Sequence, residues 1–283
     1  MADNYLERKM EEHRSGRPAA KHKSPSFATQ RKGYISVKFP PRRVFITGGA
    51  AGIGREIVRA FRAADCQVAF CDIDLKQGTA TSQETGARFY HVDVSDTTAL
   101  AVAFNDLIKH WGDVDIIVNN VGVCEFKPIS ETSLDDFDGK MAVNLRPVFL
   151  LAKLLRTHRD SLAVPNEFGG RIINIASSRH LMSEKGTSGY SASKGAITSL
   201  THSLMMDFAD LHITVNSISP GWIQTADYDS LTPEDHSQHP SGRVGKPDDI
   251  ARACIFLSMP DNDFINGIDL IIDGGMTHKM IYV

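Results

Sequence analysis

From Arg42 onward, short apolar runs alternate with longer stretches in which apolar residues recur every three or four positions. The short runs predict strands, and they cover residues 43–47, 66–72, 88–94, 114–120, 170–177, 212–219 and 268–275. The longer stretches predict helices, and they cover residues 52–64, 75–86, 98–112, 134–162, 188–211 and 248–258. Strands that alternate with amphipathic helices require a parallel sheet with helices on both faces. Right-handed crossovers then predict a doubly wound α/β fold.

The first 41 residues lack this pattern and contain several glycines and prolines that interrupt it. We therefore expect an N-terminal arm at residues 1–41, partly disordered or in contact with another subunit, and one catalytic domain at residues 42–283. The arm is basic: residues 1–43 contain 11 lysines and arginines against 4 acidic residues, whereas the remainder contains 20 against 30. An acidic body argues against nucleic acid as the main partner.

Composition narrows the class of protein further. A hydrophobic fraction of 42% and a charged fraction of 23% are ordinary for a globular chain. Cys66, Cys71, Cys124 and Cys254 form no CxxC pair and no cluster with zinc spacing, so we expect no metal and no disulfide. No apolar run is long enough to span a membrane, and the N-terminus does not resemble a signal peptide. The expected location is cytoplasmic.

A glycine-rich turn, residues 47–54 (TGGAAGIG), follows the first predicted strand and opens a helix. Gly48, Gly52 and Gly54 allow a tight turn and a close approach of the backbone to a pyrophosphate at the helix N-terminus. The second strand ends at Asp72, whose carboxylate can accept hydrogen bonds from ribose hydroxyls and would repel a 2′-phosphate. The pattern predicts a dinucleotide site that prefers NAD to NADP.

Two more turns belong to the same edge of the predicted sheet. Asp93 and Val94 follow the third strand, and Asn120 and Gly122 follow the fourth. Ligands on doubly wound sheets bind beyond the carboxyl ends of the strands, where all these residues lie.

The chemistry is predicted on the fifth strand and the helix that follows it. The strand ends at Ser177 and Ser178, and Tyr190 follows Ser178 by twelve residues. Residues four apart share one face of a helix, so Tyr190 and Lys194 can point into one site. A nearby ammonium and an oxidised nicotinamide would favour the phenolate and lower its pKa.

Together these motifs resemble those of the short-chain dehydrogenase/reductase family, whose members have a single Rossmann-like domain. The matching segments run in the family's order from about Arg43 to Gly275. They are TGGAAGIG (47–54), Asp93, NNVG (119–122), Asn144, Ser178, YSASK (190–194) and Pro220-Gly221.

The resemblance implies a role for each matching residue. Tyr190 would be the proton donor and acceptor, and Lys194 would hold the nicotinamide ribose and lower the pKa of Tyr190. Ser178 would bind the substrate oxygen, although Ser177 has the family's more frequent spacing to the tyrosine. Asn144 would anchor a water that relays protons. The implied cofactor-binding residues are Gly48, Gly52, Ile53, Gly54, Asp72, Asp93, Val94, Asn120, Gly122, Tyr190, Lys194, Pro220, Gly221, Ile223 and Thr225.

Two segments are expected to surround the substrate. Residues 222–244 form a long polar stretch without regular patterning, which is typical of a lid. His180, Met182 and Glu184 should line the opposite wall, with Cys124, Glu125 and Phe126 as further candidates. This mixture favours a small polar alcohol, a sugar or a polyol. Pro147, three residues after Asn144, should kink its helix.

The sequence thus predicts an NAD-dependent oxidoreductase that interconverts a secondary alcohol and a ketone. Alternatives within the family are a hydroxysteroid or 3-oxoacyl-type enzyme, and an epimerase or dehydratase. An alternative of another class is a non-catalytic NAD-binding redox sensor, although such a protein would be expected to lack the tyrosine or the lysine. We expect a homotetramer or homodimer, with the apolar C-terminal residues, among them Met276 and Met280, as a subunit contact.

Overall fold

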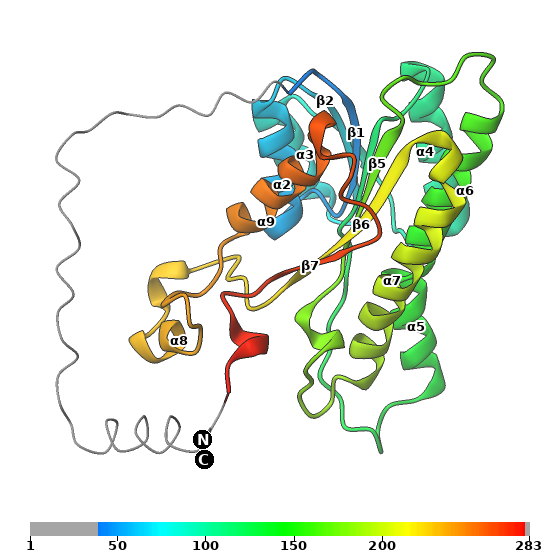
Figure 1. Cartoon of the computed structure of the whole chain (residues 1–283). Coiled ribbons are helices and arrows are strands. Elements are labelled where there is room, and N and C mark those ends of the chain that lie inside the picture. Colours follow the sequence, from blue (N-terminus) through cyan, green and yellow to red (C-terminus); the bar gives the residue numbers. More distant parts are fainter. Residues whose placement is uncertain (1–38, 281–283) are drawn as a thin grey trace, which may run out of the picture. The chain divides into compact units, whose positions relative to one another are not determined.

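Seven parallel strands form one central sheet in the computed structural model, which describes residues 39–280 (Figure 1). The strands are β1 (Arg43–Thr47), β2 (Gln67–Asp72), β3 (Arg88–His91), β4 (Ile116–Asn119), β5 (Gly170–Ile175), β6 (Ile213–Pro220) and β7 (Asp269–Ile272). Their order across the sheet is β3-β2-β1-β4-β5-β6-β7. The chain therefore changes direction across the sheet beside β1, which pairs with both β2 and β4. This confirms the predicted doubly wound α/β fold.

Helices cover both faces of the sheet. The helices are α2 (Gly52–Ala63), α3 (Leu75–Thr85), α4 (Thr97–Trp111), α5 (Leu134–Asn144), α6 (Arg146–Asp160), α7 (Ser188–Asp207), α8 (Pro233–Ser237) and α9 (Pro247–Ser258). Helices α2, α3 and α9 lie on one side, and α4, α6 and α7 lie on the other (Figure 1).

Successive residues of one strand enter the two apolar cores, because side chains alternate across a strand. Val44 and Ile46 pack with α2 and α9, whereas Phe45 between them packs against Phe104 of α4. The two cores hold the sheet rigid, and the functional side chains then project from the ends of its strands.

The predicted helix at residues 134–162 is in fact two helices. Helix α5 ends at Asn144, and α6 begins at Arg146 with Pro147 in its first turn. The backbone N–H of Val148 donates to the carbonyl of Leu145, three residues back, instead of continuing the regular ladder. The kink predicted from Pro147 is confirmed.

Two other predicted segments differ from the structure. The helix expected at 188–211 ends at Asp207 and is followed by a 3₁₀ turn, Ala209–Leu211. The segment 222–244, expected to be without regular structure, contains the 3₁₀ turn Tyr228–Ser230 and helix α8. Helix α8 is short and depends on a capping box, in which Thr232 and Asp235 bond each other's backbone N–H.

Most of the predicted N-terminal arm lies outside the described residues, as do residues 281–283. Of residues 39–41, which are described, Phe39 packs against Phe61 of α2 with ring centroids 6.2 Å apart. Among the helices of residues 39–280, none combines the length and apolar composition needed to cross a bilayer.

Candidate active site

The glycine-rich turn adopts a backbone that side chains would block. Gly48 has a φ of +72° and Gly52 a φ of +54°, a region that favours glycine. A Cβ on Gly54 would overlap the carbonyl oxygen of Gly48, so the first turn of α2 packs directly against the end of β1. The N-cap of α2, Ala51, provides no side-chain cap, and the first turn carries no acidic residue. These N–H groups are therefore suited to an anionic group such as a pyrophosphate.

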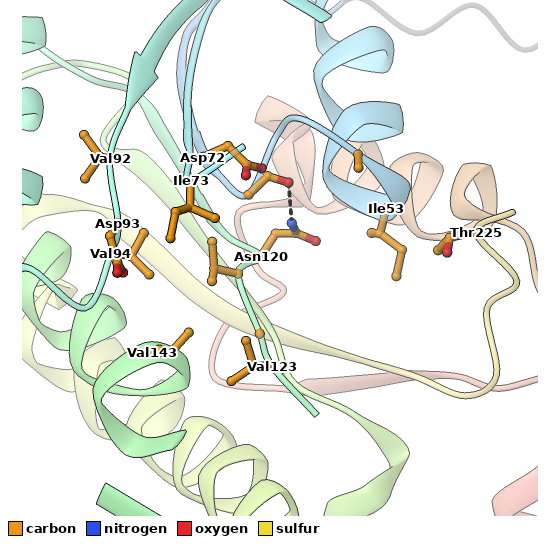
Figure 2. A pocket seen from close by; sticks show the side chains of 14 residues that line it. Ile53, Asp72, Ile73, Val92, Asp93, Val94, Asn120, Val123, Val143 and Thr225 are labelled. Carbon is orange, nitrogen blue, oxygen red and sulfur yellow. Dashed lines mark hydrogen bonds between the residues drawn. The ribbon is translucent and has the colours of Figure 1, made fainter. Parts of the chain in front are cut away.

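Asp72 holds this turn in place from the end of β2. One carboxylate oxygen accepts the backbone N–H of Ala50 at 2.9 Å, and the other accepts the N–H of Asp74 at 3.0 Å. A carboxylate oxygen can accept more than one hydrogen bond, so both oxygens retain acceptor capacity. Asp72 also lines the adjacent cavity, beside Ile73 (Figure 2).

Asn120 ties the end of β4 to the same turn. Its side-chain amide donates to the carbonyl of Thr47 at 3.0 Å and to that of Gly48 at 3.1 Å. Figure 2 shows the bond to Gly48. The Thr47 hydroxyl in turn accepts the backbone N–H groups of Asn120 and Val121. Three strand ends, those of β1, β2 and β4, are thereby joined into one rim.

This rim borders a cavity of about 450 Å³. Its lining residues are Gly48, Ala51, Ile53, Asp72, Ile73, Val92, Asp93, Val94, Asn120, Val121, Gly122, Val123, Val143 and Thr225. Eight of them belong to the predicted cofactor set. The hollow is apolar with a few polar groups at its edge, as expected for the face of a nucleotide.

Tyr190 and Lys194 lie on one face of α7, as their spacing predicts. The Lys194 ammonium lies 5.6 Å from the centroid of the Tyr190 ring and donates to the carbonyl of Ile175 at 2.7 Å. Burial lowers the pKa of Lys194 to about 8. A Cβ on Gly122 would come within 3.0 Å of the ammonium, so Lys194 also borders the first cavity's wall.

The serine that contacts the Tyr190 phenol is Ser177. Burial raises the pKa of Tyr190, and a hydrogen bond with the Ser177 hydroxyl acts in the opposite direction. Ser178 follows at the start of the 3₁₀ turn Ser178–His180 and is also buried beside the cavity. This contact favours Ser177 for the role that the family resemblance implies for Ser178, and both serines line the second cavity.

A nearby ammonium and an oxidised nicotinamide were expected to lower the pKa of Tyr190. In the structure, the pKa of Tyr190 is instead raised above its ordinary value, because burial of the phenol outweighs the bond with Ser177 and the charge of Arg179. The ammonium of Lys194 lies beside the ring and is bonded to Ile175, which limits its effect on the phenol oxygen.

Asn144 connects the two halves of the site at the break between α5 and α6. Its side-chain amide donates to Val123 O and to the Ser193 hydroxyl, and its side-chain oxygen accepts the N–H of Val123. The side chain is 1% exposed. Asn144 therefore fixes the loop after β4 against α7, at Ser193, which directly precedes Lys194.

Tyr190 lines a second cavity, of about 500 Å³. Its lining residues are Cys124, Phe126, Ser177, Ser178, Arg179, Met182, Ser183, Glu184, Tyr190, Gly221, Trp222, Ile223, Gln238 and Met276. Consecutive residues, Val123 and Cys124, line the first and second cavities. The two cavities therefore adjoin at the loop after β4.

Some predicted site residues line neither cavity. The predicted residues that lie behind the lining of the two cavities are Gly52, Gly54, Asn144, Lys194 and Pro220. Two residues expected in the substrate wall are occupied elsewhere: His180 bonds the carboxylate of Asp269 at 2.9 Å, and Glu125 pairs with Lys140 at 3.3 Å.

The sequence analysis missed several lining residues. In the first cavity these are the apolar residues Ile73, Val92, Val123 and Val143. In the second cavity they are Arg179 and Ser183, and Met276, which was expected at a subunit contact, lines it as well. Trp222 and Gln238 come from the predicted segment 222–244. Only Arg179 had a readable signal, since it directly follows the two serines.

Comparison with known proteins agrees with this geometry. Residues 48–277 match the family model described as "Enoyl-(Acyl carrier protein) reductase". An uncharacterized oxidoreductase of Thermotoga maritima is 38% identical over 251 residues, which cover 84% of this chain and 96% of that protein. The chain belongs to the short-chain dehydrogenase/reductase family.

Other members of this family are similar to the chain over nearly its whole domain. An L-fucose dehydrogenase of Mus musculus is 33% identical, covering 84% of this chain and 89% of that protein. A sorbitol dehydrogenase of Cereibacter sphaeroides is 31% identical, covering 83% and 96%. A solved apo SCOR enzyme from Clostridium thermocellum superimposes with a TM-score of 0.76 at 35% identity, covering 85% of this chain and 95% of that chain. The fold and the oxidoreductase family are therefore shared.

Proposed function

We propose that the protein is an NAD(H)-dependent oxidoreductase that interconverts a secondary alcohol and a ketone, with Tyr190 as general acid and base. The observation that carries this proposal is the position of the Tyr190 phenol. The phenol bonds the Ser177 hydroxyl in the wall of the second cavity, and the Lys194 ammonium lies 5.6 Å from the centroid of its ring. A sensor that only binds the cofactor would have no use for a proton donor at this point.

The rim of the first cavity fits a nicotinamide dinucleotide. The α2 N-terminus and the glycine turn suit the pyrophosphate, and Asp72 suits the adenosine ribose. Among the described residues that line this cavity, none is lysine or arginine, which leaves the charge of a 2′-phosphate without a partner. Both features favour NAD over NADP.

When bound, the nicotinamide supplies or accepts the hydride. The chain's own residues handle the proton and the orientation. Tyr190 gives a proton to the ketone oxygen during reduction and takes it back during oxidation. Ser177 donates a hydrogen bond to the same oxygen and orients it. Lys194, whose ammonium lies beside the ring, would hold the nicotinamide ribose, and the oxidised nicotinamide ring would favour the phenolate.

The second cavity favours a small polar substrate. Arg179, Glu184 and Gln238 offer charged and amide groups, while Phe126 and Trp222 offer apolar faces. Sugars and polyols combine hydroxyl groups with apolar C–H faces, so they suit this lining. The similarity to sorbitol and L-fucose dehydrogenases supports the same class.

Replacement of Tyr190 by phenylalanine tests the proposal. Tyr190→Phe should bind NADH normally by calorimetry and lose turnover by roughly 10²- to 10⁴-fold, because only the proton path is removed. Turnover is followed at 340 nm against a panel of sugars, polyols, hydroxysteroids, hydroxy acids and simple alcohols.

Tyr90→Phe is the matched control. Tyr90 lies on β3 and lines neither cavity, and its hydroxyl donates to Asp106 at 2.8 Å. Loss of this hydroxyl should therefore leave turnover unchanged. Near-normal turnover by Tyr190→Phe would refute the catalytic assignment. NADH binding with no turnover of any substrate class by the wild type would favour the sensor.

A further inference from the structure

Arg179 and Glu184 form an ion pair in the wall of the second cavity. A guanidinium nitrogen of Arg179 lies 2.7 Å from a carboxylate oxygen of Glu184. Both residues line the cavity, and their side chains are 25% and 58% exposed. Exposure of this size leaves both charged groups accessible to a small molecule in the cavity.

The pair lies close to the reacting groups. The backbone N–H of Arg179 donates to the Ser177 hydroxyl at 3.2 Å, which fixes Arg179 beside the serine that contacts Tyr190. The guanidinium lies 5.8 Å from the centroid of the Phe126 ring, which supports its long side chain. Its positive charge acts to lower the pKa values of both Tyr190 and Cys124, so the charge reaches the catalytic end of the cavity.

The hydrogen-bonding capacity of the pair selects between substrate groups. Arginine only donates, and an ionised glutamate only accepts. A hydroxyl group does both, so it can accept from Arg179 and donate to Glu184 at once. A substrate carboxylate would bond Arg179 but repel Glu184, and a plain hydrocarbon would remove water from both charges without replacing its bonds.

We propose that Arg179 and Glu184 together bind a hydroxyl group on the carbon next to the reacting one, so that the substrates are α-hydroxy ketones and the corresponding vicinal diols. This inference rests on the proposed oxidoreductase function and makes its substrate class specific. The pair acts as a specificity determinant, and Ser177 and Tyr190 remain responsible for the reacting oxygen.

Three ketones that differ only beside the carbonyl test the inference. Butan-2-one has a methyl group there, 1-hydroxybutan-2-one a hydroxymethyl group and 2-oxobutanoate a carboxylate. With NADH, the wild type should reduce 1-hydroxybutan-2-one with a kcat/KM roughly 10- to 100-fold above that for butan-2-one, as expected for hydrogen bonds to charged groups.

The double variant Arg179→Met/Glu184→Met removes both charges without leaving either unpaired. Its preference for 1-hydroxybutan-2-one over butan-2-one should fall to within about 3-fold of unity. The readout is this ratio, because the charge of Arg179 also acts on Tyr190 and its loss changes the reduction of both ketones alike. The control is Arg59→Met/Glu84→Met, which removes a similarly exposed ion pair between α2 and α3. It should keep the wild-type preference, and thermal unfolding shows whether each variant is folded.

The outcomes separate this inference from the proposed function. Equal reduction of the two uncharged ketones, preference for 2-oxobutanoate, or a preference that survives in the double variant would each overturn the role of the pair. In all three cases the Tyr190-dependent activity would still stand. Reduction that persists in Tyr190→Phe, or reduction of none of the ketones while NADH binds, would count against the proposed function itself.

Discussion

Asp72→Asn should change the cofactor preference, and the structure indicates by how much. The variant removes one negative charge and keeps the side chain's size. It weakens the bonds to the ribose hydroxyls of NADH by about 1 kcal/mol, since a charged acceptor becomes neutral. It also removes the repulsion of a 2′-phosphate, worth about 1–2 kcal/mol for a half-exposed pair of charges. Together the two effects favour NADPH by about 2–3 kcal/mol, so the ratio of kcat/KM for NADPH to that for NADH should rise roughly 30- to 150-fold.

The same substitution has a structural cost that must be measured separately. The Asp72 carboxylate accepts the N–H groups of both Ala50 and Asp74, and an asparagine oxygen replaces only one of its two oxygens. We expect a loss of about 1 kcal/mol in the free energy of unfolding, seen by urea titration.

Asp93→Asn is the control for this experiment. Asp93 lines the same cavity, but it accepts only from the N–H and hydroxyl of Ser95 within its own turn. Its substitution should weaken NADH and NADPH by the same factor. If Asp72→Asn left the ratio unchanged, or if Asp93→Asn changed it equally, ribose recognition would have to lie elsewhere.

Two further substitutions test the rigidity and the electrostatics of the site. Gly54→Ala should abolish NADH binding in calorimetry and lower the unfolding temperature strongly, because its Cβ would overlap Gly48 O. The control is Gly139→Ala in α5, where a Cβ meets nothing within 4 Å. It should stabilise the chain by up to about 1 kcal/mol. The folded pKa of Lys194, about 8, lies below its ordinary value of 10.5, so between these pH values the unfolded chain binds a proton that the folded chain has lost. The free energy of unfolding should then rise with pH across that window, by on the order of 1–3 kcal/mol, and Lys194→Met should lack this part of the rise in urea titrations at pH 7 and 10.

The cofactor half of the site was predictable because the sheet determines it. Parallel strands place their carboxyl ends at one edge, so Gly48, Asp72, Asp93 and Asn120 had to lie together once the strands were recognised. The period of apolar residues identifies the strands, and the spacing of the motifs places these residues at the ends of the strands. The apolar lining, such as Val143 on α5, escaped prediction because it depends on which helix packs over the edge.

The substrate half was predicted less well because loops build it. Ser177 and Ser178 differ by one position at the end of β5, where the backbone leaves the strand and enters a 3₁₀ turn. Which hydroxyl points to Tyr190 depends on the dihedral angles of that turn, which spacing alone does not give. His180 was expected in the wall but turns toward Asp269, a residue 89 positions later that no local pattern connects with it.

The segment 222–244 shows why a polar stretch without periodicity can still present defined side chains. Its conformation rests on its own hydrogen bonds: the Tyr228 hydroxyl donates to Val244 O at 2.7 Å, and His236 accepts the N–H of Val244 at 3.1 Å. Two backbone bonds close the base of the segment: Gly245 N–H donates to Trp222 O, and Gln224 N–H donates to Gly245 O. Local bonds of this kind, together with the packing of Ile223 against one apolar core, position Trp222 in the second cavity. Because the proposed function places substrate in the second cavity, single polar substitutions in this segment should alter specificity while leaving the fold intact.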